Sequence, residues 1–81
     1  MAKILYFATL VDQLGHAAEE VALPDAITDV RSLLAWLRTR GGNWERLLAE
    51  NAVRVTVNKQ FSSLETKLNN NDEIALITMH F

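Results

Sequence analysis

The stretch Asn69-Asn70-Asn71-Asp72-Glu73-Ile74-Ala75-Leu76-Ile77-Thr78-Met79-His80-Phe81 decides the fold that the sequence predicts. A polar turn comes first, and an apolar run then continues to the last residue. Chain ends usually fray, so an apolar run at this position indicates a strand that the rest of the fold holds in place. We therefore expect a core strand here, with its end projecting outward.

Composition limits the classes of protein to which the chain can belong. Its 81 residues indicate a single domain, 1–81, with a modest core, since so short a chain buries only about 60% of its unfolded surface. There is no cysteine, which excludes disulfides and thiolate chemistry. A net charge of −2 gives no reason to expect nucleic acid, and neither a signal peptide nor a membrane-spanning run is visible. We expect a cytoplasmic protein.

The first third of the chain predicts a hairpin. Residues 3–10 are apolar on both faces of the predicted strand, as in a strand inside a sheet. Phe7 then lies on the face that no helix covers, unless the two faces are reversed. A connection follows, with at most one helical turn at 11–14, because Gly15 weakens a helical interpretation. Residues 18–23 are expected to form the second strand.

The main helix is expected at about 28–40, where apolar residues follow the i, i+3, i+4, i+7 spacing of a one-faced helix. These residues are Ile27, Val30, Leu33, Leu34 and Leu37. Thr28 or Asp25 can cap the start of the helix, and Gly41 permits a left-handed exit. The stripe predicts that Leu34 is a core residue.

The second half of the chain predicts a short helix and three strands. Asn43 can cap a helix over residues 44–50, and residues 52–58 alternate strictly, as in a strand with one wet face. A tight turn at 58–59 leads to a short strand at 60–62. With the last strand, this order indicates an α+β fold, the ubiquitin-like β-grasp. It has a mixed four- to five-stranded sheet, one main helix on one face, and the first and last strands parallel at the centre.

No catalytic constellation or metal site is visible. His16 and His80 are far apart in a chain without cysteine, which makes a weak case for a metal. Ser32, Ser62 and Ser63 have no evident base, and there is no glycine-rich phosphate loop. We expect a non-catalytic protein without a metal or cofactor.

Apolar residues on a face that is expected to be wet are the most informative feature. If Ile74 and Leu76 face the main helix, the residues that alternate with them in the last strand are exposed on the opposite face, beside the first strand. The candidate docking residues are Phe7, Phe61, Ile77, Met79 and Phe81. A different register would place some of them in the core, whereas a contiguous patch of this size marks a protein interface.

Several segments resemble the MoaD/ThiS family of sulfur carriers, and within it the small subunits of molybdopterin synthase. They are Lys3-Ile4-Leu5-Tyr6-Phe7-Ala8, the loop reaching Leu14-Gly15, the main helix, Val55-Thr56-Val57-Asn58, and Leu68 followed by Asp72-Glu73-Ile74-Ala75. The resemblance covers almost the whole chain. It implies a ubiquitin-like fold and partner contacts at Phe7, Phe61 and Ile77.

The resemblance also implies a chemistry. Family members end in Gly-Gly, and an adenylating enzyme of the ubiquitin-activating type (MoeB-like) activates the terminal carboxylate for conversion to a thiocarboxylate. The tail inserts into the large subunit of molybdopterin synthase (MoaE-like) and donates sulfur to the pterin precursor of the molybdenum cofactor.

The end of the chain departs from this pattern. Thr78 and Met79 stand where the family usually has two prolines, and the tail residues His80 and Phe81 stand about where the glycines would begin. The bulky Phe81 is not expected to be adenylated efficiently. Two alternatives remain: residues are missing after Phe81, or the chain is a MoaD-like binding module that keeps the docking face without carrier activity. A third hypothesis is that the chain is a sulfur carrier for thiamine synthesis or tRNA thiolation.

Overall fold

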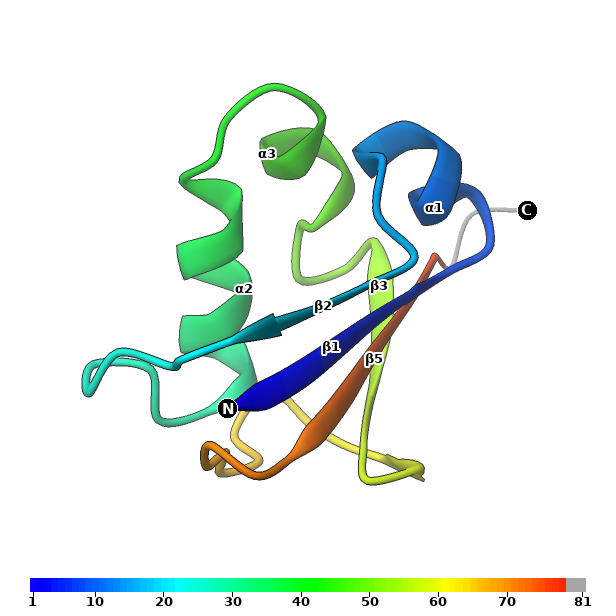
Figure 1. Ribbon diagram of the computed structural model, residues 1–81. Helices are drawn as coiled ribbons and strands as arrows, with labels where there is room; N and C mark the ends of the chain where they lie inside the picture. Colours follow the sequence, from blue (N-terminus) through cyan, green and yellow to red (C-terminus); the bar gives the residue numbers. More distant parts are fainter. Residues whose placement is uncertain (79–81) are drawn as a thin grey trace.

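The computed structural model describes residues 1–78 and contains a five-stranded mixed sheet in the order β2-β1-β5-β3-β4, with the helices above it (Figure 1). The strands are β1 (Ala2–Phe7), β2 (Ala18–Val21), β3 (Val53–Val57), β4 (Gln60–Phe61) and β5 (Glu73–Thr78), and the helices are α1 (Thr9–Leu14), α2 (Val30–Arg38) and α3 (Asn43–Leu47). This is the predicted arrangement, with a further short helix, α1, between the first two strands.

The central strand of the sheet is β5, which lies parallel to β1 and antiparallel to β3. The register pairs Ile4 with Ile74 and Tyr6 with Leu76, and all four side chains are buried. The last apolar run of the sequence is therefore a core strand, as predicted. Its expected continuation over 79–81 lies outside the described residues.

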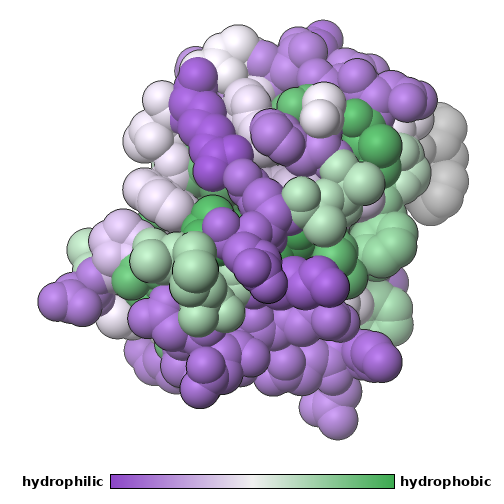
Figure 2. Space-filling view, viewed as in Figure 1, coloured by the Kyte–Doolittle hydropathy of each residue, from purple (hydrophilic) through white to green (hydrophobic). Residues whose placement is uncertain are grey.

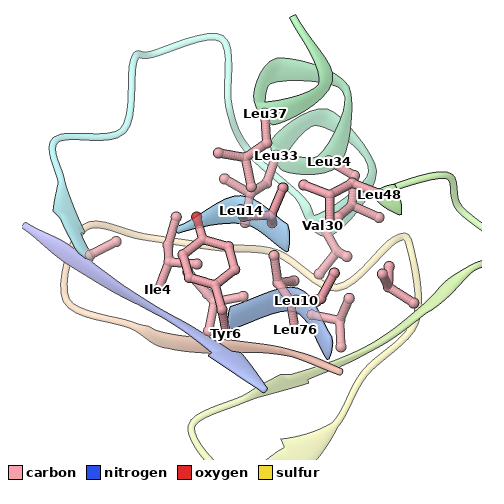
Figure 3. Packing of buried hydrophobic residues seen from close by; sticks show 14 of the residues in the cluster. Ile4, Tyr6, Leu10, Leu14, Val30, Leu33, Leu34, Leu37, Leu48 and Leu76 are labelled. Carbon is pink, nitrogen blue, oxygen red and sulfur yellow. The ribbon is translucent and has the colours of Figure 1, made fainter. Parts of the chain in front are cut away.

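The inner face of the sheet is covered by α2, whose apolar stripe is buried as predicted. Figure 3 shows the side chains of α2 packing with those of β1, β5 and α1. The stripe consists of Val30, Leu33, Leu34 and Leu37. The helix itself is shorter than the expected range 28–40, because its first turn begins after a cap at Asp29.

That cap was not the predicted one. The Asp29 carboxylate accepts a hydrogen bond from the Ser32 backbone N–H at 2.8 Å, and the Ser32 hydroxyl accepts one from the Asp29 N–H at 3.1 Å. This reciprocal pair is a capping box in which serine takes the place of the usual Glu or Gln. The expected caps, Thr28 and Asp25, were wrong. Serine at the third position of the helix is not part of the usual capping-box pattern, so the sequence did not mark Asp29 as the cap.

The strand expected over residues 3–10 ends at Phe7, and α1 takes up the next stretch. Leu10 and Leu14, four residues apart on one helix face, are both buried in the core. The prediction of a connection with at most one turn was wrong. Gly15, at φ 78°, ends the helix in the left-handed conformation and does not interrupt it.

Gly15→Ala is expected to lower the free energy of unfolding by about 1 kcal/mol, because a left-handed conformation strains any residue with a Cβ. No atom lies within 4 Å of the added Cβ, so the backbone alone carries the cost. Urea denaturation measures the loss. Gly15→Asn should lose less, since asparagine tolerates this conformation better. Unchanged stability of the alanine variant would contradict this helix end.

The helix α3 is also shorter than the expected range 44–50, and Asn43 does not cap it. The N-cap position is held by Gly42, while the Asn43 side-chain amide donates to the backbone oxygen of Gln13 at 3.1 Å. This bond ties α3 to the end of α1. Leu48, which follows α3, is fully buried.

Two polar turns fix the register of the central strand. Asn58 and Lys59 both have positive φ, 52° and 71°, as in the tight hairpin turn that was predicted. The Asn58 side chain donates to Asp72 Oδ1 and accepts from the Glu73 N–H, each at 3.0 Å. The β3–β4 hairpin is thereby joined to the first residue of β5.

Candidate functional site

The face of the sheet opposite α2, here termed the outer face, consists of three rows that the strand register defines. The first row is Phe7, Ile77 and Arg54. The second row is Ala18, Leu5, Ala75, Thr56 and Phe61. The third row is Glu20, Lys3 and Glu73. Two largely apolar rows thus lie beside one charged row.

The orientation expected for the last strand is confirmed. Ile74 and Leu76 face α2, while Phe7 lies beside Ile77 on the outer face. Phe7 is 45% exposed and Phe61 72%, whereas Ile77 is half-buried. Figure 2 shows hydrophilic residues over the lower part of the molecule and hydrophobic residues toward the right, around the end of β1. The alternative register is thereby excluded for Phe7, Phe61 and Ile77.

The predicted patch is divided by an arginine. Phe61 lies two strands away from Ile77, and Arg54 of β3 lies between them, with its guanidinium Cζ 5.3 Å from the centroid of the Phe61 ring. Arg54 was not among the predicted docking residues, although it is one of the polar residues that alternate with valines over 52–58. The remaining predicted residues of the face and tail, Met79, His80 and Phe81, lie outside the described residues.

The titratable groups with the strongest mutual contacts lie on the other side of the sheet. Tyr6 Oη donates to Glu19 Oε1 at 2.6 Å, and Arg40 Nη1 donates to the same oxygen at 2.9 Å. Burial and the bond to Glu19 raise the pKa of Tyr6. Partial burial raises the pKa of Glu19, but hydrogen bonds from Tyr6 and Arg40 outweigh it and leave that pKa below its usual value. Because these groups satisfy one another, the cluster stabilises the fold.

The sequence of the chain matches the model of one protein family. Residues 4–79 match the ThiS family. The chain belongs to the ThiS family. A search of curated proteins finds no match.

Solved structures share the fold of this ThiS-family chain at low identity. A putative molybdopterin converting factor, subunit 1, from Pyrococcus furiosus is 24% identical, with a TM-score of 0.79 over 95% of this chain and 94% of that one. Small archaeal modifier protein 1 of H. volcanii is 22% identical, with a TM-score of 0.67 over 95% and 94%. The Amycolatopsis orientalis BexX/CysO complex contains a chain that is 18% identical, with a TM-score of 0.71 over 100% and 98%. These likenesses confirm the predicted ubiquitin-like β-grasp fold.

Family membership gives a coarse function. ThiS-family proteins are small carriers that work with partner enzymes, and this chain is a small protein of that type. Within residues 1–78, no group of three His, Cys, Asp or Glu side chains is placed to hold a metal ion. No helix in the same range has the length and apolarity needed to cross a membrane.

The stability of this ThiS-family protein is expected to fall as the pH rises above about 10, the ordinary pKa of tyrosine. Tyr6 keeps its proton in the folded state when the unfolded chain has lost it. The stability that protonated Tyr6 contributes is therefore complete below that pH and is lost as the pH rises above it. Denaturation at a series of pH values measures the decline. Tyr6 is the only tyrosine, so phenolate absorbance reports its ionisation directly.

Tyr6→Phe is the control for this pH dependence. It should be less stable at neutral pH, because it lacks the bond to Glu19, and its alkaline decline should be shallower. The two proteins share every other ionisable group, so the comparison isolates Tyr6. Identical alkaline slopes would show that Tyr6 ionises as freely in the folded state as in the unfolded chain.

Proposed function

We propose that this chain is the small, sulfur-carrying subunit of molybdopterin synthase and acts in the biosynthesis of the molybdenum cofactor. The observation that carries the proposal is the parallel pairing of β1 with β5 in a ThiS-family fold. This pairing sets Phe7 beside Ile77, one residue before β5 ends at Thr78. A partner that takes up the C-terminal tail therefore meets this apolar pair as well.

The chemistry follows from the family resemblance. A MoeB-like adenylating enzyme activates a C-terminal glycine carboxylate with ATP, and sulfur transfer then produces the thiocarboxylate. A MoaE-like large subunit holds the pterin precursor and receives the sulfur. Glycines suit such a tail, because without side chains it fits a narrow channel and leaves its carbonyl carbon accessible. The residues of this chain bind the partner and aim the tail, while the partner enzymes supply the catalytic groups.

The outer face is the proposed surface for the large subunit. Phe7 and Ile77 form its apolar centre, and Phe61 lies toward the β4 edge. Exposed aromatic side chains of this kind act as anchors when a partner surface buries them. The Pyrococcus furiosus structure, described as a molybdopterin converting factor subunit, supports the choice of pathway.

Reconstitution tests the pathway. The chain extended by Gly-Gly and converted to the thiocarboxylate is mixed with the large subunit and the pterin precursor, and the sulfur-containing pterin is measured. We expect product only when all three are present, and the chain ending in Phe81 serves as the control. Transfer of sulfur to thiazole-forming enzymes but not to the pterin would place the protein in thiamine synthesis. Transfer to tRNA-thiolating enzymes alone would place it in tRNA modification.

A ubiquitin-like modifier is the second candidate, because the fold is shared with small archaeal modifier protein 1 of H. volcanii. A modifier would form covalent adducts with lysines of other proteins when given the adenylating enzyme and ATP. A dedicated carrier would form none. Denaturing gel electrophoresis of the Gly-Gly-extended chain separates these outcomes. A third candidate, a binding module without carrier activity, would bind the large subunit but stay unmodified.

A further inference from the structure

Arg54 lies within the outer face and not at its margin. It is the register partner of Ile77, which in turn pairs with Phe7, so the three side chains form one row across β3, β5 and β1. The Arg54 guanidinium also lies over the Phe61 ring. Any surface that covers both Phe7 and Phe61 must therefore cover Arg54.

Each of the other charged residues in the outer-face rows has an opposite charge in register with it, whereas Arg54 has no such counterpart. Lys3 stands in register with Glu20 on one side and Glu73 on the other. The ion pairs found within residues 1–78 involve Arg31 and Arg40 and do not involve Arg54. In this part of the chain, Arg54 is a cation in the docking surface without a carboxylate within ion-pair distance.

Docking changes the energetics of this side chain. A partner that packs on Phe7 and Ile77 removes water from the neighbouring guanidinium, and a desolvated charge is costly unless an opposite charge and hydrogen bonds replace the water. Stacking on Phe61 restricts the guanidinium plane before the partner arrives, so less conformational entropy is lost in binding.

We propose that Arg54 determines the specificity of this docking surface, and that the partner protein presents an Asp or Glu carboxylate to it beside an apolar patch that covers Phe7 and Ile77. This inference rests on the proposed function, since it takes the outer face as the partner-binding surface. A carboxylate matches the guanidinium through two parallel hydrogen bonds. A polyanion such as nucleic acid fits poorly, because Glu20 and Glu73 lie on the same face of the sheet and the net charge is −2.

The test uses the full chain and the large subunit of molybdopterin synthase in isothermal titration calorimetry. Arg54→Gln is expected to weaken binding roughly 30-fold or more and to reduce its dependence on salt. Arg54→Lys should recover part of the affinity. Arg31→Gln, on α2 and with the same change of charge, is the matched control and should bind as the parent does. Unchanged affinity of Arg54→Gln would overturn the proposal.

Charge reversal identifies the carboxylate. Arg54→Glu should bind more weakly than Arg54→Gln, and changing one Asp or Glu of the large subunit to Arg should restore binding at least about tenfold. Failure of every such reversal to restore binding would also overturn the proposal. Phe7→Asp keeps the two ideas apart. If Phe7→Asp weakens binding and Arg54→Gln does not, the outer face is the docking surface but the partner presents no carboxylate to Arg54. If Phe7→Asp has no effect, the docking surface itself is wrong.

Discussion

Phe7→Asp is expected to weaken binding of the large subunit of molybdopterin synthase by about 2 kcal/mol or more, which is roughly 30-fold in Kd. Among residues 1–78, Phe7 is the exposed aromatic residue nearest the end of the central strand, and it is paired with Ile77. In the complex, a carboxylate at this position would be buried against apolar side chains without a partner. Calorimetric titration of the large subunit measures the loss, and Ile77→Asp should act in the same direction.

Two controls show whether weaker binding comes from a lost contact with the partner or from unfolding of the variant. Because Phe7 is 45% exposed in the free chain, the variant should unfold at nearly the same urea concentration as the parent. Phe61→Ala should weaken binding less, because Phe61 lies two strands away from Ile77, whereas Phe7 lies on the neighbouring strand. An unaltered Kd for both the Phe7 and the Ile77 variants would show that the partner binds elsewhere.

Leu34→Ala is expected to lower the free energy of unfolding by about 2–5 kcal/mol. The Leu34 side chain is fully buried between α2 and the sheet, and shortening it leaves a cavity as well as removing apolar contact (Figure 3). A small domain has little stability to spare, so the variant should be close to unfolding at physiological temperature.

Leu47→Ala is the matched control for the core. It makes the same chemical change at a half-buried position on α3, and its loss should be clearly smaller. Urea denaturation followed by tryptophan fluorescence measures both variants. Equal losses at Leu34 and Leu47 would mean that the helix stripe does not form the centre of the core.

Most of the fold could be predicted because its periodicities are simple. The spacing over Val30 to Leu37 identified the buried face of α2, and strict alternation over 52–58 identified the strand β3, which the structure places at Val53–Val57. The first helix was missed because Gly15 was taken as an interruption, although the residues before it are already spaced for one buried helix face. A glycine near a pattern's end can terminate the helix as readily as break it.

The candidate site was predicted in part. The alternation of residues in the last strand placed Ile77 beside Phe7, and Phe61 was predicted to join the same patch. The position of Arg54 between them could not be predicted, because the register of β3 on β5 depends on the Asn58 and Asp72 turns, which are distant in sequence. One sequence gives the face of each residue in a strand, but it does not show which residues of two strands stand side by side.

The central claim is that this fold presents its C-terminus for activation as a sulfur carrier. The most direct test is the intact mass of the chain extended by Gly-Gly after incubation with a MoeB-like adenylating enzyme, ATP and a sulfur donor. Omission of ATP is the control. We expect a gain in mass equal to the replacement of one carboxylate oxygen by sulfur, dependent on ATP. An unchanged mass under conditions that convert an established carrier would contradict the assignment.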